Sequence, residues 1–311
     1  MTKFKLKDFK GIIPAHLTTF DENMKFDPKR SKGLIDFAIE MGAGGLYLSG
    51  SNGMGPMMSV AERKQVIEVT MEQVEGRVPV VVHVGAPSSC MAIDLAQFAE
   101  KCGVTGVSAV PPYYGVHPLD VVYEYYKRIA ESTGLPFVIY AMSGYAGFQY
   151  NVETVKKLAS ITNVDGMKYT GPHHYMMGRI RSAMPDDFMM YSGSDEMMLS
   201  AQLMGVKDVI GGTYNVMPDI YAQAKKELWE GDAKQASKLI LAANDILEIF
   251  FKFNMANSML ECLRYMGVDA GYNRCPTPTM TDEQRAGLRK AMTEYAKSSD
   301  IENVRLLDAL R

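Results

Sequence analysis

Eight short apolar segments alternate with longer amphipathic segments through the first two thirds of this 311-residue chain. Several of the apolar segments are almost continuous runs of Val, Ile, Leu and Tyr, as strands that are covered on both faces require. In the segments between them, apolar residues recur every three or four positions, which indicates helices. Strands that alternate with helices predict a parallel sheet, and eight of them predict an α/β fold of the (β/α)8 TIM-barrel class. The predicted strands span residues 11–18, 44–50, 78–85, 106–112, 136–142, 164–170, 187–193 and 207–212.

An open, doubly wound sheet is the alternative arrangement for such a pattern. Its first strand is typically followed by a G-x-G-x-x-G turn that binds a dinucleotide, and no such turn follows residues 11–18. The glycine-rich stretches at 42–45 and 50–53 have a different spacing. The closed barrel is therefore the preferred interpretation.

The pattern changes after about residue 218. Residues 219–232, 233–254 and 257–267 have the pattern of consecutive helices without a clear strand between them, and residues 281–298 form a last amphipathic segment. We therefore predict two parts, a barrel over residues 1–218 and a C-terminal helical appendage over residues 219–311 that packs on it.

Composition narrows the choice of partners. The net charge is −3, which provides no basic surface for nucleic acid. The first twenty residues contain no long apolar run, so neither a signal peptide nor a membrane span is expected. The four cysteines form no CxxC pair and are expected to be reduced thiols. A cytoplasmic protein without membrane or nucleic-acid partners follows as the expectation.

Lys168 is the strongest candidate for a catalytic residue. It lies inside an apolar strand segment, between Met167 and Tyr169. Because a barrel has no open edge, a lysine at this position faces a closed interior. Burial disfavours the charged ammonium group, and the neutral amine is a nucleophile. The alternative is a lysine at a strand end that extends its amine to solvent.

Tyr140 ends the neighbouring strand segment, 136–142, and its phenol is expected to lie within reach of the Lys168 amine. A phenol can carry protons in a dry pocket. The alternative is a core tyrosine whose hydroxyl is hydrogen-bonded, which is common among the 17 tyrosines of this chain.

The loop at residues 50–53 follows the second strand, at the end of the barrel where active sites lie. Its glycines allow close approach of the backbone, and Ser51 and Asn52 can donate hydrogen bonds to a carboxylate. An ordinary turn between strand and helix is the alternative. The histidines have no partner at metal-ligand spacing, so no metal site is expected.

Seven motifs, in order, carry a family resemblance from about Gly11 to about Pro278. The motifs are GSNG at 50–53, PPYY at 111–114, IY at 139–140, GMKYT at 166–170, SGSDEMML at 192–199, IGGTYNV at 210–216 and GVDAGYNRCP at 267–276. With these motifs the chain resembles the N-acetylneuraminate lyase and dihydrodipicolinate synthase family of class I aldolases, and the stretch from Tyr191 to Pro276 resembles the lyase branch most.

The resemblance implies a role for each matching residue. Lys168 would form the Schiff base and Tyr140 would move protons. Ser51 and Asn52 would hold the carboxylate of the keto acid. Tyr114 would reach into the site of a neighbouring subunit, since the family forms tetramers built from tight dimers. The positions implied in binding the rest of the substrate are Thr170, Gly193, Asp195 and Glu196 for the sugar chain, and Gly211 for the keto acid.

The chain also departs from the family pattern. Asn52 replaces a threonine and Met54 an acidic residue, while Gly212 stands where the lyases commonly carry a serine that touches the substrate. Tyr145 stands where the synthases place an arginine for a second carboxylate, which argues against a synthase.

Three functions remain open from the sequence. The first is a sialic acid lyase that releases pyruvate from N-acetylneuraminate through an imine on Lys168, without a cofactor. The second is another pyruvate-dependent aldolase or dehydratase acting on a 2-keto-3-deoxy sugar acid, which the altered Asn52, Met54 and Gly212 keep as an alternative. The third is a non-catalytic barrel that binds keto acids, against which Lys168 and Tyr140 argue.

Overall fold

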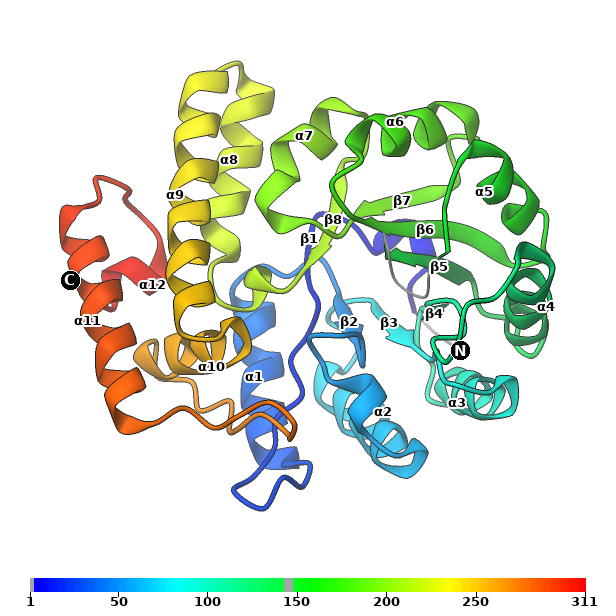
Figure 1. The fold of residues 1–311 in the computed structure, drawn as a ribbon, viewed down its shortest axis with the longest axis horizontal. Coiled ribbons are helices and arrows are strands. Elements are labelled where there is room, and N and C mark those ends of the chain that lie inside the picture. The colour runs from blue at the N-terminus through cyan, green and yellow to red at the C-terminus, as the bar shows by residue number, and fades with distance from the viewer. Residues whose placement is uncertain (1–2, 143–147) are drawn as a thin grey trace.

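Eight parallel strands form the predicted barrel in a computed structural model that describes residues 3–142 and 148–311 (Figure 1). The hydrogen-bonded order is β1-β8-β7-β6-β5-β4-β3-β2. A bridge between Ala15 and Tyr47 joins β1 to β2 and closes the ring. Each predicted strand segment contains one observed strand. The strands are β1 (Ile12–Pro14), β2 (Leu46–Leu48), β3 (Val80–His83), β4 (Gly106–Ala109), β5 (Phe137–Met142), β6 (Val164–Thr170), β7 (Met189–Ser192) and β8 (Asp208–Gly211).

A helix follows each of the first seven strands, as the periodicity predicts. Polar caps explain where several of them begin: the Asp27 carboxylate accepts from the first backbone N–H groups of α1, and Ser59 and Glu62 form a capping box at α2. These helices are α1 (Pro28–Glu40), α2 (Val60–Val74), α3 (Ser89–Lys101), α4 (Leu119–Ala130), α5 (Val152–Ala159), α6 (His174–Ala183) and α7 (Met198–Leu203).

One helix starts later than the sequence indicates. The pattern at residues 195–204 predicts a continuous helix, whereas a 3-10 turn, η4 (Asp195–Met197), precedes α7. The Asp195 side chain caps no helix and instead accepts hydrogen bonds from Thr213. The first turn thus serves to place a carboxylate at the end of the barrel.

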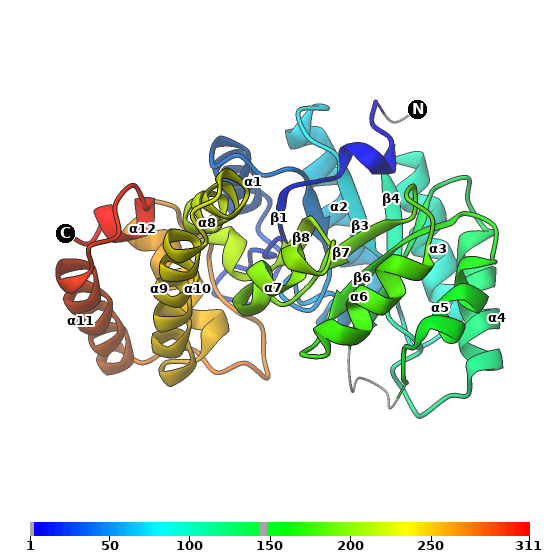
Figure 2. The ribbon, with the colours of Figure 1, turned by 90° about the horizontal axis from the view of Figure 1, so that it is seen from above.

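The C-terminal helices lie on one side of the barrel, away from α3, α4 and α5 (Figures 1 and 2). Their apolar side chains share a core with β1 and β8, in which Ile12 and Val209 belong to the same cluster as Leu263 and Leu306. The division at residue 218, where α8 starts, stays a prediction. These helices are α8 (Pro218–Glu230), α9 (Ala233–Lys252), α10 (Met255–Tyr265), α11 (Asp282–Ser298) and α12 (Arg305–Asp308), the last of which the sequence pattern did not indicate.

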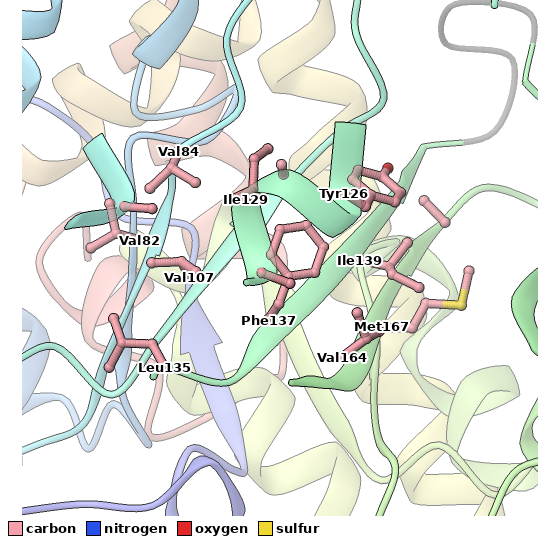
Figure 3. Close-up of a cluster of buried hydrophobic side chains, with 14 of the residues drawn as sticks. Val82, Val84, Val107, Tyr126, Ile129, Leu135, Phe137, Ile139, Val164 and Met167 are labelled. Atoms are coloured by element: carbon pink, nitrogen blue, oxygen red, sulfur yellow. The ribbon is translucent and has the colours of Figure 1, made fainter. Parts of the chain in front are cut away.

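The strands separate an outer core from an inner one. In β5, Phe137 and Ile139 face outward into the cluster beneath the helices, with Tyr126 and Ile129 of α4 among its members (Figure 3). The alternate residues Val138 and Tyr140 belong to the cluster inside the barrel. Because side chains alternate along a strand, the position of Tyr140 in β5 determines that it points inward.

The amino-terminal end of the barrel is closed by the segment that precedes β1. Leu6 and Phe9 belong to the inner cluster, and Leu6 lies in the 3-10 turn η1 (Leu6–Asp8). Phe9 packs edge-on against Tyr191, whose hydroxyl donates a hydrogen bond of 3.0 Å to the Phe9 carbonyl oxygen. The inner core is therefore covered at the amino-terminal end of the strands.

Candidate active site

Lys168 lies inside the barrel near the carboxyl end of β6. Its register partners are Tyr140 in β5 and Tyr191 in β7, and its side chain is 3% exposed. Nζ lies 4.2 Å from the centroid of the Tyr140 ring and 4.7 Å from that of Tyr47. Within residues 3–142 and 148–311, Nζ makes no hydrogen bond or ion pair. The amine is thus surrounded by aromatic rings and has no fixed polar partner, which leaves it available to attack a carbonyl carbon.

Tyr140 is held in place by two aromatic contacts. Its ring packs edge-on against Tyr47, at 6.0 Å and 90°, and against His83, at 5.8 Å and 89°. Both contacts restrict the ring, so the phenol stays beside the Lys168 amine. The structure therefore brings together the two residues that the sequence singles out for chemistry.

His83, in β3, supports this arrangement as a neutral ring. The Val110 N–H donates to Nε2 at 3.2 Å, so the ring hydrogen is on Nδ1, which donates to the Ser49 carbonyl oxygen at 3.2 Å. Burial lowers the pKa of His83 well below its ordinary value, and the positive charges of Arg63 and Lys168 lower it further. His83 therefore orients Tyr140 and the loop after β2 without carrying charge.

The loop after β2 bends sharply over the end of β1. Ser49 and Met54 have left-handed backbone angles, with φ of +54° and +52°. The Thr18 hydroxyl donates to the Gly53 carbonyl oxygen at 2.6 Å, which ties the loop to the segment after β1. Ser51 is exposed and Asn52 is half-buried at the mouth of the barrel. Both predicted carboxylate-binding residues thus lie at the carboxyl end of the barrel.

Thr170 and Gly193 lie directly beside Lys168. A Cβ atom on Gly193 would lie 1.9 Å from Thr170 Oγ1 and 2.9 Å from Lys168 Cε, so only glycine fits there. Thr170 Oγ1 is buried and has no hydrogen-bond partner among the described residues. A buried hydroxyl without a partner is costly unless a ligand satisfies it.

Asp195 is a buried carboxylate on the far side of the same cluster. Its Oδ2 accepts hydrogen bonds from the Thr213 N–H at 2.8 Å and from the Thr213 hydroxyl at 2.7 Å. Burial raises the pKa of Asp195 to about 6, although the Thr213 hydrogen bonds act in the opposite direction. A Cβ atom on Gly211 would lie 1.6 Å from Asp195 Oδ1, so this glycine makes room for the carboxylate. Glu196, the next residue, is exposed.

Arg274 joins the C-terminal region to the loops at the barrel mouth. Its guanidinium forms an ion pair with Glu62 at 2.5 Å, and donates to the Met24 and Met57 carbonyl oxygens at 3.0 Å each. The Arg274 pairing lowers the pKa of Glu62 to about 2. The backbone N–H of Arg274 also contacts Met54 Sδ, at the end of the loop that carries Asn52.

Tyr114 is the one predicted site residue that lies apart. It follows β4, is 86% exposed, and does not belong to the buried cluster around Lys168. Tyr145, which the sequence sets against a synthase, lies outside the described residues.

Sequence reasoning missed three of these residues, namely Tyr47, His83 and Arg274. Tyr47 and His83 have the signal that identified Tyr140, since each lies in a strand segment near its carboxyl end. Arg274 had no such signal, because its partners are more than two hundred residues away in the chain.

Residues 3–142 and 148–311 also bear on metal binding and membrane insertion. No group of three or more His, Cys, Asp or Glu side chains there is arranged to hold a metal ion. No helix in this part of the chain has both the length and the apolar character needed to cross a membrane. All four cysteines are free.

A closed barrel with a buried lysine next to a tyrosine, and a hydrogen-bonding loop beside them, defines a Schiff-base aldolase by fold and site. Comparison with known proteins agrees. Residues 8–295 match the model of the dihydrodipicolinate synthetase family, and the chain belongs to that family. Its members are pyruvate-dependent class I aldolases, which are carbon–carbon lyases that work through a lysine imine without a cofactor.

The chain is similar to several N-acetylneuraminate lyases. It is 35% identical over 263 residues to the enzyme of Citrobacter koseri, and the matched region covers 84% of this chain and 88% of that protein. An Escherichia coli N-acetylneuraminate lyase is 33% identical over 262 residues, with the same coverage.

Solved structures show the same likeness. The CdNal protein of Clostridium difficile in complex with mannosamine superposes with a TM-score of 0.89 at 28% identity, covering 92% of this chain and 99% of that one. The sialic acid aldolase of Ruminococcus gnavus gives a TM-score of 0.88 at 28% identity, covering 97% and 98%.

Proposed function

We propose that this protein is a sialic acid lyase that cleaves N-acetylneuraminate to pyruvate and N-acetylmannosamine. The observation that carries the proposal is the position of the Lys168 amine, buried in the barrel and 4.2 Å from the Tyr140 ring. The similarity to N-acetylneuraminate lyases over most of the chain supports the choice of substrate.

The reaction begins with attack of the Lys168 amine on C2 of the open-chain keto acid. Tyr140 donates its proton to the hydroxyl of the resulting carbinolamine, which leaves as water and gives a protonated imine beside a Tyr140 phenolate. The imine accepts electrons from the bond beta to it. Tyr140 takes the proton of the C4 hydroxyl, the C3–C4 bond breaks, and its electrons form an enamine on Lys168. The products of this step are the aldehyde and the enamine of pyruvate.

Tyr140 then returns its proton to C3 of the enamine, which gives the imine of pyruvate. Water hydrolyses this imine, releases pyruvate and restores the amine of Lys168, while the Tyr140 phenolate takes the proton that is set free. All bonds are made and broken by the lysine, the tyrosine and water, so the protein needs no additional electron acceptor.

The other predicted residues would hold the substrate. Ser51, Asn52 and the backbone of their loop would bind the carboxylate, near Gly211. The Thr170 hydroxyl, which has no hydrogen-bond partner among the described residues, and the Asp195 carboxyl would bind the hydroxyls of a sugar chain. The exposed Glu196 would hold the outer end of that chain. Gly193 would leave room for it beside the amine.

We also propose a cytoplasmic homotetramer built from tight dimers. Tyr114 would then leave its own surface, where it is 86% exposed, and complete the site of a neighbouring subunit. Specific activity should fall when the enzyme is diluted until dimers dissociate.

A coupled assay for pyruvate, with N-acetylneuraminate and 2-keto-3-deoxygluconate in parallel, tests the proposal. Borohydride added with pyruvate should trap a covalent adduct on Lys168. Release of pyruvate only from 2-keto-3-deoxygluconate would favour the second function, an aldolase for shorter sugar acids, which the altered residues Asn52 and Gly212 keep as an alternative. Binding of keto acids without an adduct and without turnover would indicate a non-catalytic barrel.

A further inference from the structure

Two adjacent glycines at the end of β8, Gly211 and Gly212, each lie against a polar side chain from another loop. Gly211 lies against Asp195, as described above. A Cβ atom on Gly212 would lie 2.9 Å from Asn52 Oδ1, 3.0 Å from Nδ2 and 3.1 Å from Cγ. These separations are shorter than ordinary contacts between a Cβ and other heavy atoms, so the Asn52 amide occupies the space that a side chain at position 212 would need.

This contact spans the point where the barrel closes. Asn52 follows β2 and Gly212 follows β8, while β1 lies between those two strands in the ring. The Asn52 side chain therefore reaches across the carboxyl end of β1. The loop that carries it is fixed by the Thr18 hydrogen bond to Gly53 and by the contact of Met54 with Arg274.

The Asn52 amide lies against Gly212 without making a hydrogen bond to the described residues. It is half-buried, and neither Oδ1 nor Nδ2 has a hydrogen-bond partner in the described part of the chain. An amide presents two donors at its nitrogen and an acceptor at its oxygen. A partly buried amide with both ends free is suited to a ligand that offers an acceptor and a donor side by side.

We propose that Asn52, whose amide lies against Gly212, determines which keto acids the enzyme accepts. The inference rests on the proposed function. The Nδ2 hydrogens donate to the substrate carboxylate, and Oδ1 accepts from a hydroxyl of the carbon chain that extends from the imine. The site thereby selects 2-keto acids with a hydroxylated chain, and Gly212 is the positioning residue that permits the amide to lie there.

Substitution N52T separates the two contacts. The threonine hydroxyl can donate to the carboxylate, but the threonine side chain is too short to contact Gly212 as the Asn52 amide does. We expect the half-saturating pyruvate concentration for borohydride trapping to change by less than about threefold. We expect kcat/KM for N-acetylneuraminate to fall by about tenfold or more, since a hydrogen bond to a substrate hydroxyl is lost.

Substitution G212S tests the contact between Gly212 and the Asn52 amide. In the native background its Cβ collides with the Asn52 amide, and kcat/KM should fall by about tenfold. In the N52T background the space is open, so G212S should cost less than about twofold or restore activity. G33S is the matched control, because a Cβ on Gly33 in α1 meets no atom within 4 Å. If G212S does not fold, G212A repeats the test with the Cβ alone.

Two results would overturn the proposal. Equal losses from G212S in the native and N52T backgrounds would show that Asn52 and Gly212 are not coupled. Equal losses of pyruvate capture and of cleavage in N52T would show that the amide serves only the carboxylate. If the native enzyme does not cleave N-acetylneuraminate, the proposed function fails, and the same four proteins tested on 2-keto-3-deoxygluconate still decide whether the pair is coupled.

Discussion

Asp195 accepts two hydrogen bonds on one carboxylate oxygen from the backbone N–H and the hydroxyl of Thr213, at 2.8 and 2.7 Å. Oδ1 takes no part in this pairing, which ties the loop after β7 to the end of β8. Burial raises the pKa of the Asp195 carboxyl from 3.8 to about 6, so its charge changes within the range in which the enzyme can be assayed.

Substrate binding should therefore depend on pH through Asp195. Above about pH 6 the carboxylate is ionised and accepts from sugar hydroxyls, whereas below that pH it is protonated and a poorer acceptor. We expect KM for N-acetylneuraminate to rise as the pH falls through 6, with half-saturation by pyruvate unchanged. T213V removes one hydrogen bond to the charged form, so the step should move to higher pH. A step that persists in D195N would assign it to another group.

Removal of the amine or of the phenol should have distinct effects. K168A should abolish turnover and borohydride trapping together, because no imine can form. Y140F retains the amine and the ring contacts but loses the proton carrier, so trapping by pyruvate should remain while kcat falls by about 10²–10⁴-fold. Mass spectrometry of trapped protein and steady-state rates measure the two quantities. An adduct on K168A would show that another lysine is the nucleophile.

Gly193 should tolerate no side chain. In G193A the new Cβ would lie 1.9 Å from Thr170 Oγ1 and 2.9 Å from Lys168 Cε, which displaces both. We expect a loss of about a hundredfold in kcat/KM from misplacement of the reacting amine. G33A is the control, since its Cβ meets nothing within 4 Å, and far-ultraviolet circular dichroism should show both variants folded. Native activity in G193A would mean that Lys168 can move freely.

The Arg274–Glu62 pair should stabilise the folded protein at neutral pH. The pairing lowers the pKa of Glu62 from 4.5 to about 2, so its contribution is present above pH 4.5 and is lost as the pH falls towards 2. The side chains are only 16% and 27% exposed, and R274A also removes hydrogen bonds to Met24 and Met57. We expect R274A to lower the free energy of unfolding by about 2 kcal/mol.

Denaturant titration of native protein, R274A and E62Q at pH 7 and pH 4 measures this effect. E62Q keeps the size of the side chain and should cost less than R274A, because Arg274 retains its carbonyl partners. The difference between native protein and E62Q should shrink at pH 4. A constant difference at both pH values would contradict the assigned pairing.

The barrel was predictable because its strands are covered on both faces. Continuous apolar runs such as residues 78–85 and 136–142 supply apolar side chains both to the outer core under the helices and to the inner cluster. This property can be recognised within each run, without knowledge of the rest of the chain. The position of Lys168 within such a run likewise shows in the sequence, since a charged residue there must face a closed interior. Tyr140 followed from the adjacent strand by the same reasoning.

The contacts that complete the site could not be predicted from the sequence pattern. The pairs Asp195 with Thr213, Asn52 with Gly212 and Arg274 with Glu62 join positions that are 18 to 212 residues apart in the chain. No periodicity links such positions, because the distances between loop ends depend on how the barrel closes and on which neighbours each strand acquires.

The amino-acid sequence by itself determined the alternation of strands and helices, the inward lysine and tyrosine, and the loop rich in glycine and hydrogen-bonding groups. Only the tertiary structure decided that Asn52 rests on Gly212, that Asp195 is a buried carboxyl with a raised pKa, and that Arg274 holds the loops at the mouth. The physical reason is that secondary structure follows from the spacing of apolar residues along the chain, whereas desolvation and hydrogen bonding depend on atoms brought together by folding.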